Sequence, residues 1–213
     1  MPVPESSAAD PRNSARRDGS RPVLGHVNLM VDTLIANANL EDLRAIVRGM
    51  LATSPPSAAQ AFTGAARQRL QRTNAAAVPD DIAGVFDAGD GSDAAPTAAL
   101  AAVLVRTRAL YGSGLGFASL RILAAVVRAT VGLRWPEGGP MEDSLALVDA
   151  DISQAIQSAK EERDGGRAED VQAARAVVQE LREAVAESQL DARKWAGAFA
   201  FERAAASLEH WRL

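Results

Sequence analysis

The sequence predicts an all-α protein: an irregular multi-helix bundle of seven to eight helices behind a disordered N-terminal tail, with stacked helical hairpins as an alternative arrangement. Three observations favour this class. Apolar residues recur at helical spacing over most of the chain. No stretch alternates apolar and polar residues for long enough to suggest a strand. The chain is also alanine-rich, with 45 alanines among 213 residues, and alanine is the strongest helix former.

The first part of the chain combines a tail with helices. Residues 1–24 are rich in Ser, Pro, Ala and charge without apolar periodicity, which predicts a disordered tail. The pattern of residues 25–73 predicts a set of N-terminal helices. The last of these helices is expected to start at Ser57. The segment 39–53 carries the clearest pattern, because its apolar residues share one helix face: Leu40, Leu43, Ile46, Val47, Met50 and Leu51.

The composition of residues 74–96 predicts an acidic linker loop. They contain five aspartates and no basic residue, and they separate the N-terminal helices from the main helical bundle, residues 97–213. The functional alternative is a divalent cation site, since hard cations take several carboxylate oxygens. The aspartate spacing does not match that of a calcium-binding helix–loop–helix motif. We therefore expect a solvated loop and no metal.

The main bundle is expected to contain five helices separated by glycine- and proline-rich breaks, at about 96–111, 117–135, 141–162, 168–189 and 191–212. The segment 117–135 is apolar on nearly all sides, and a helix without a polar face belongs in the middle of a bundle. The glycine-rich run 112–116 has neither the preceding strand nor the following lysine of a phosphate-binding loop. It is therefore interpreted as a helix break.

Charge is distributed unevenly along the bundle. Residues 96–135 hold five arginines and no acid, whereas residues 136–170 hold ten acids and three basic residues. One interpretation is that basic and acidic helices pack side by side and neutralise each other. The other is a basic face for an acidic partner or a nucleic acid, built from Arg106, Arg108, Arg121 and Arg128.

Aromatic residues gather at the end of the chain, where four of the nine lie within the last 19 residues. On a continuous helix over 191–212, Trp195, Phe199 and Trp211 would share one side. This helix either closes the core or presents a tryptophan-anchored surface to a partner, because Trp is enriched at interface hot spots.

Several classes of chemistry lack the residues they need. The chain has no cysteine and two histidines, which excludes thiol nucleophiles and cysteine-ligated metal sites. Asp149 and Asp151 are two apart on a predicted helix, so they point to different sides and cannot share an ion. We expect no catalytic residues, no metal and no cofactor. Arginines interrupt the most apolar window and no targeting segment is evident, so we expect no membrane partner and an intracellular location, cytoplasmic or nuclear.

The functional hypothesis is a non-enzymatic protein–protein interaction module: an adaptor, or a regulatory or assembly subunit. The expected partner-binding residues come from the arginine-rich helix edge and from the aromatic C-terminal helix: Arg106, Arg108, Arg121, Arg128, Trp195, Phe199 and Trp211. The alternative is a nucleic-acid-binding helical protein that uses the arginines of 96–135. An enzyme built from carboxylates on distant helices comes third. The partner and the oligomeric state stay open.

Overall fold

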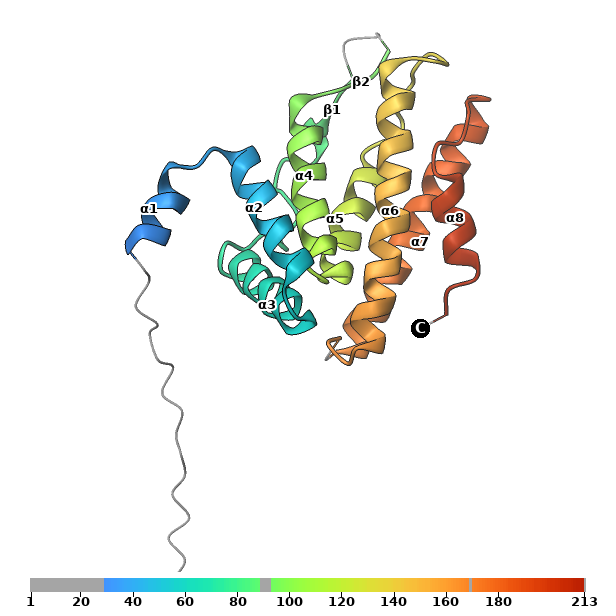
Figure 1. The fold of residues 1–213 in the computed structure, drawn as a ribbon. Helices are drawn as coiled ribbons and strands as arrows, with labels where there is room; N and C mark the ends of the chain where they lie inside the picture. Colours follow the sequence, from blue (N-terminus) through green and yellow to red (C-terminus); the bar gives the residue numbers. More distant parts are fainter. Residues whose placement is uncertain (1–28, 89–92, 169, 213) are drawn as a thin grey trace, which may run out of the picture. The chain divides into compact units, whose positions relative to one another are not determined.

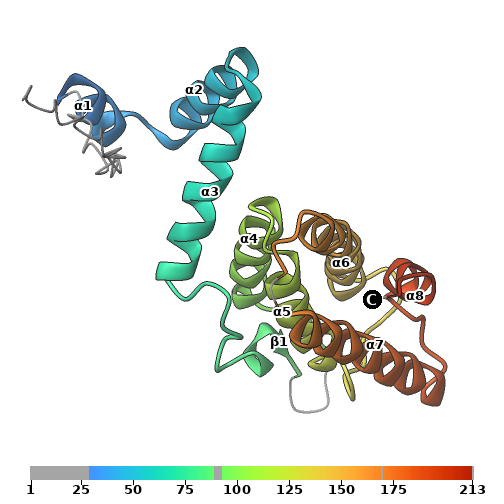
Figure 2. The same cartoon turned by 90° about the horizontal axis from the view of Figure 1, so that it is seen from below.

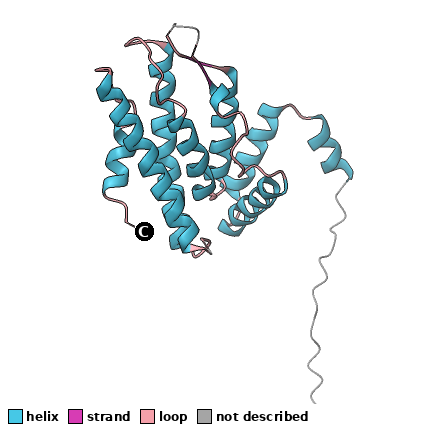
Figure 3. Ribbon diagram, turned by 180° about the vertical axis from the view of Figure 1, so that it is seen from behind, coloured by secondary structure: helices cyan, strands magenta, loops and turns pink. Residues whose placement is uncertain are grey.

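The computed structural model describes residues 29–88, 93–168 and 170–212, and it confirms the all-α class (Figures 1 and 3). The predicted tail, residues 1–24, lies outside the described residues. The described part contains eight α-helices: α1 (Leu29–Asn37), α2 (Leu40–Thr53), α3 (Pro56–Arg72), α4 (Ala98–Gly112), α5 (Gly116–Arg128), α6 (Pro140–Asp164), α7 (Val171–Lys194) and α8 (Glu202–Glu209).

The chain divides into two compact units between Thr53 and Ser54. The first unit holds α1 and α2. The second holds α3 to α8, so α3 groups with the main bundle and not with the two helices before it. The residue range 74–96 therefore lies inside the second unit.

Helix α5 forms the centre of the second unit, as its apolar circumference predicts. It packs against α4, α6 and α7, while α8 packs on α6 and α7 (Figure 2). Most of its circumference is buried, and six of its side chains have no exposed surface: Leu120, Ile122, Leu123, Ala124, Val126 and Val127.

The first turn of α5 crosses α6 at backbone contact distance. A Cβ atom on Gly116 would lie 2.2 Å from the amide nitrogen of Ala159 and 2.6 Å from the carbonyl carbon of Ser158. Only glycine leaves room for this approach. The glycine-rich run thus ends α4 at Gly112 and also admits α5 to the surface of α6.

The segment 74–96 is built into the bundle. It forms a short 3₁₀ turn, η1 (Ala83–Val85), and two two-residue strands, β1 (Phe86–Asp87) and β2 (Ala95–Pro96), that pair antiparallel. Val85, Phe86 and Ala94 are buried. These strands could not be predicted from the sequence, because two residues are too few to show alternation.

The predicted helix 191–212 is wrong. Helix α7 continues to Lys194, residues 195–201 form a loop, and α8 starts at Glu202. The break is a helix-ending motif: the amide of Gly197 donates to the carbonyl of Ala192, and the amide of Ala196 donates to that of Arg193. Ala196 has a φ of 55°, which stops the helix.

The helix predicted at 117–135 ends early as well, at Arg128. The turn that follows contains Gly132 with a φ of 88°, a conformation that favours glycine. The carboxylate of Asp191 on α7 accepts a hydrogen bond from the amide of Gly132 at 2.9 Å. This long-range bond fixes the turn where local sequence would allow more helix.

Candidate interaction surfaces

Two of the predicted interface arginines are bonded to their own chain. Arg106 donates from Nε to the carbonyl of Ala75 at 2.6 Å and from Nη2 to the carbonyl of Asn74, so it anchors the segment that follows α3. Arg108 forms an ion pair with Asp151 on α6 at 2.9 Å. The hydroxyl of Tyr111 donates to the same carboxylate at 3.0 Å. These guanidinium groups tie α4 to its neighbours.

Arg128 joins α5 to the acidic face of α7. Its guanidinium lies 2.8 Å from Glu180, 3.7 Å from Glu183 and 3.6 Å from Glu187. Arg121 is exposed and forms no ion pair among the described residues. Basic and acidic helices therefore lie side by side at this contact. Of the four predicted interface arginines, Arg121 alone has no carboxylate or carbonyl bonded to it in the described part of the chain.

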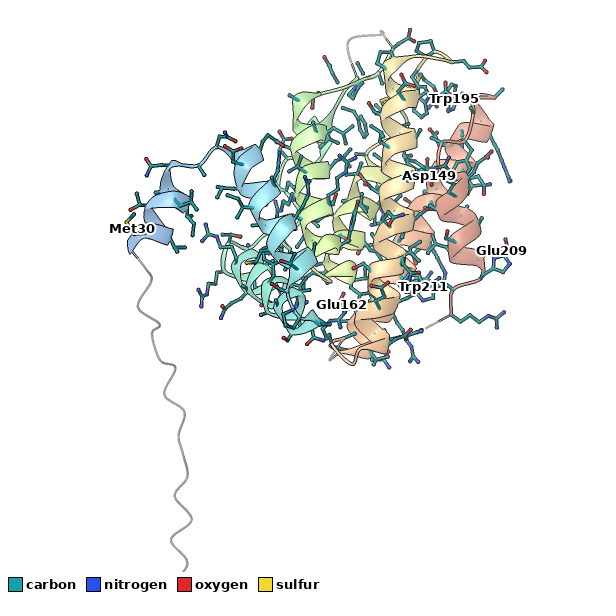
Figure 4. All side chains as sticks on the ribbon, in the orientation of Figure 1. Met30, Asp149, Glu162, Trp195, Glu209 and Trp211 are labelled. Carbon is teal, nitrogen blue, oxygen red and sulfur yellow. The ribbon has the colours of Figure 1, made fainter. Side chains whose placement is uncertain are left out.

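The predicted aromatic residues lie in separate places. Trp195 is half-buried and packs edge-on against Trp135, with ring centroids 5.2 Å apart. Phe199 lies in the loop before α8. Trp211 is only 3% exposed and stacks on Phe117 at 6.2 Å. Figure 4 shows Trp195 and Trp211 near opposite ends of α8. They do not form a shared aromatic face, because the continuous helix that would align them is absent.

Buried carboxylates of α6 bind the free amides at the starts of two other helices, a role that our sequence analysis did not assign to them. Asp149 on α6 accepts hydrogen bonds from the amides of Arg203 at 3.2 Å and Ala204 at 2.8 Å, at the start of α8. Glu162 accepts one from the amide of Phe117 at 3.1 Å, at the start of α5. Both carboxylates are labelled in Figure 4.

The pKa values of Asp149 and Glu162 are both shifted by burial. Burial raises the pKa of Asp149 above its ordinary value, although the amides of Ala204 and Arg203 act in the opposite direction. Burial likewise raises the pKa of Glu162. A sequence signal did exist: the residues at the N-caps of α5 and α8 are Leu115 and Phe201, which have no side-chain acceptor. The free amides had to be satisfied from elsewhere.

The pKa of Asp191 is shifted in the opposite direction, downward. Its hydrogen bond with Arg134 and the amide of Gly132 hold the pKa of Asp191 below its ordinary value. The stabilisation is thus present above the ordinary pKa of about 4 and is lost as the pH falls through the lower folded-state value. We expect Arg134→Gln to lower the free energy of unfolding by about 1 kcal/mol at pH 7, because the arginine is half exposed to solvent.

The loss at low pH should be smaller, since a protonated Asp191 no longer attracts the guanidinium. Arg134 also lies over the ring of Trp195 at 5.1 Å, and that contact is lost equally at both pH values. Urea denaturation near pH 7 and below pH 3 measures the difference. An equal loss at both pH values would contradict the role given to Asp191.

Exposed apolar side chains are most frequent in the first unit, and one more lies on α3. Among the described residues, thirteen large hydrophobic side chains are exposed, and eight of them come from residues 30–62: Met30, Val31, Leu34, Ile35, Leu40, Ile46, Met50 and Phe62. Helix α2 has no buried residue at all. The amphipathic pattern that made α2 the clearest helix in the sequence therefore presents an apolar face to solvent.

The described residues hold no group of three or more His, Cys, Asp or Glu side chains placed to bind a metal ion. No helix in the same part of the chain is both long and apolar enough to cross a membrane. Comparisons with models of protein families, with curated proteins and with solved structures give no match. Function is therefore argued from the chain's own surfaces.

Proposed function

We propose that the protein is a non-enzymatic assembly module that self-associates through its first unit, with the α2 helices of two copies pairing antiparallel. The observation that carries this proposal is the exposed apolar face of α2. Leu40 and Met50 on this face are exposed, and Leu43 and Val47 between them are partly exposed. The four follow a spacing of three and four residues, which is the seam of two helices packed along each other. Exposed apolar surfaces of this kind mark interfaces.

Both helices of the first unit contribute exposed apolar surface. Seven side chains of α1 and α2 are between 47% and 75% exposed, together equal to about four whole side chains: Met30, Val31, Leu34, Ile35, Leu40, Ile46 and Met50. Four of these side chains lie on α1 and three on α2, so the interface would include both helices. Burying one such side chain contributes ~1.5–3 kcal/mol, which acts against the cost of association.

The first unit also offers a recess for a partner side chain. A cavity of about 410 Å³ lies between α1 and α2, lined by Leu34, Ala38, Asp42, Ala45 and Ile46, among others. A side chain of a second copy could fill it as a knob fills a hole.

Charge favours the antiparallel arrangement. The acids of α2, Glu41 and Asp42, lie in its first turn, whereas Arg44 and Arg48 follow toward its C-terminus. Antiparallel pairing places the acidic end of one copy beside the basic part of the other, and parallel pairing would place like charges together. The face therefore fits a second copy of itself.

Sedimentation equilibrium of the full chain tests the proposal. We expect a dimer with a Kd on the order of 1–100 µM. Met50→Glu should weaken the dimer at least ~10-fold, because Met50 lies on the seam opposite Leu40 of the other copy and the two-fold symmetry places two charges against apolar side chains. The matched control is Leu190→Glu on α7, where a leucine is 57% exposed and no pairing is proposed.

Both substituted residues are exposed, so the main bundle should keep its helical circular dichroism in either variant. The control should dimerise like the unmodified chain. A chain that stays monomeric at about 100 µM would exclude the proposal, and so would equal weakening by the two substitutions, which would indicate unspecific hydrophobic association.

A further inference from the structure

A polar cavity of about 480 Å³ lies between α3, the turn that joins α4 to α5, and the end of α6. We name it the arginine pocket. Its walls include Thr63 and Arg67 of α3, Ser113 and Gly114 of the turn, Ser158 of α6, and Arg167 beyond the end of α6.

The two arginines converge on Gly114. A Cβ atom on Gly114 would lie 3.5 Å from Nη1 of Arg67 and 3.5 Å from Nη2 of Arg167, so these two nitrogens are at most 7 Å apart. Gly114 has a φ of 83°, a conformation that favours glycine, and the missing side chain leaves both guanidinium groups uncovered.

Within the described part of the chain, both arginines are bonded to backbone carbonyls and not to carboxylates. Arg67 donates to the carbonyl of Ser113 at 2.8 Å, and Arg167 donates to the carbonyl of Glu161 at 3.2 Å. Neither forms an ion pair with a carboxylate of the described residues. Since a guanidinium has five N–H groups, each arginine keeps most of its donors free.

Two glutamates, Glu161 and Glu162, lie near the arginine pocket, and their negative charges would act against a bound anion. The carboxylate of Glu162 is buried and accepts from the amide of Phe117. Glu161 is one of the residues that line the pocket, and its carboxylate accepts from the side chain of Gln157 at 3.0 Å. The charge of Glu162 also acts on Arg67 and Arg167, so both acids would oppose a bound anion, and Glu161 is the exposed one that can be replaced without disturbing the core.

An apolar cavity of about 380 Å³ adjoins the arginine pocket. The two cavities share Thr63, Gly112 and Ser113, and the second is lined by apolar side chains that include Phe62, Ala66, Leu70 and Ala109. A ligand that fits both would need an anionic group at one end and a compact apolar group at the other.

From this geometry we infer that the arginine pocket binds a phosphate monoester whose organic group is apolar. A phosphate monoester presents three acceptor oxygens and nearly two negative charges, which suits two guanidinium groups at this separation. Its apolar group would lie in the adjoining cavity along Phe62 and Leu70. This inference is independent of the self-association proposed above.

Isothermal titration calorimetry of the full chain with phenyl phosphate, inorganic phosphate and benzyl alcohol tests the inference. We expect one phenyl phosphate per chain, bound at least ~10-fold more tightly than either simpler probe, because only phenyl phosphate fills both cavities. Arg67→Gln and Arg167→Gln should each weaken binding at least ~10-fold, since each removes charge-assisted hydrogen bonds.

Glu161→Gln should have the opposite sign and tighten binding about 2- to 5-fold, because it removes a negative charge beside the phosphate. The matched control is Arg72→Gln, an exposed arginine of α3 outside the pocket, which should leave binding unchanged. Thermal unfolding of each variant verifies that the fold is intact. Arg167 lies outside the helices, so we expect its replacement to leave the packing of α3 unchanged.

Three results would overturn the inference: no saturable binding of phenyl phosphate, benzyl alcohol binding as tightly as phenyl phosphate, or equal weakening by Arg72→Gln and Arg167→Gln. The last would indicate general attraction to basic surface instead of a site.

Discussion

Replacing Gly116 by alanine is expected to lower the free energy of unfolding by about 4 kcal/mol or more, the range reached when a well-packed core is disrupted. The added Cβ atom would lie 2.2 Å from the amide nitrogen and 2.5 Å from the Cα atom of Ala159. These are backbone atoms of a helix, which cannot rotate away as a side chain would. Helix α5 would have to withdraw from α6, and α5 is the centre of the core.

The matched control for this substitution is Gly112→Ala, four residues earlier on the chain. A Cβ atom there meets nothing within 4 Å, and Gly112 ends helix α4. Alanine at this position should stabilise the protein by roughly 0.5–1 kcal/mol. Chemical denaturation measures both values. If Gly116→Ala and Gly112→Ala shifted the denaturation midpoint equally, the close crossing of α5 and α6 would be wrong.

Phe201→Ala is expected to cost about 3–5 kcal/mol of unfolding free energy, the usual cost of removing a fully buried aromatic ring. Phe201 has no exposed surface, and its ring packs edge-on against Phe199 with centroids 6.1 Å apart. It immediately precedes α8, whose first free amides are bound by Asp149. The cavity left by the ring would therefore loosen the attachment of α8 to α6.

Phe62→Ala provides the comparison, since this phenylalanine of α3 is 44% exposed. Removing it should cost less than about 1 kcal/mol, because little buried area is lost. Urea denaturation of the two variants at one pH measures the contrast. Similar losses for the two substitutions would show that the loop 195–201 does not anchor α8 through Phe201.

The parts of the fold that the sequence predicted are those governed by local periodicity. Helix α2 could be located from the spacing of its six apolar residues, and the central position of α5 from its apolar circumference. Both features depend only on residues within one helix. The sequence could not tell that the face of α2 is exposed, because burial depends on what packs against it.

The errors arose where distant residues decide the structure. The helix expected over 191–212 breaks because Ala196 adopts a positive φ in a helix-ending motif, against the general preference of alanine for helix. Spacing predicts only that Asp149 and Asp151 point to different sides of their helix, yet Asp149 caps α8 from 54 residues away. Caps of this kind leave a trace in the sequence only as a helix start without a polar residue.

The candidate site was the least predictable part. Arg106, Arg108 and Arg128 were grouped by proximity in sequence, and the structure bonds them to three different neighbours. Arg67 and Arg167 are 100 residues apart, so no local pattern could have joined them. The arginine pocket is therefore a product of tertiary structure, whereas the apolar face of α2 follows from local spacing.

Disulfide cross-linking tests the antiparallel pairing of α2 most directly, since the chain contains no cysteine of its own. In an antiparallel pair centred near residue 45, position 40 of one copy faces position 50 of the other. We predict that a mixture of Leu40→Cys and Met50→Cys chains, carrying tags of different size, forms mainly the mixed disulfide under mild oxidation. Cross-linking dominated by pairs of Leu40→Cys chains, or no faster than that of a Leu190→Cys control, would contradict the proposal.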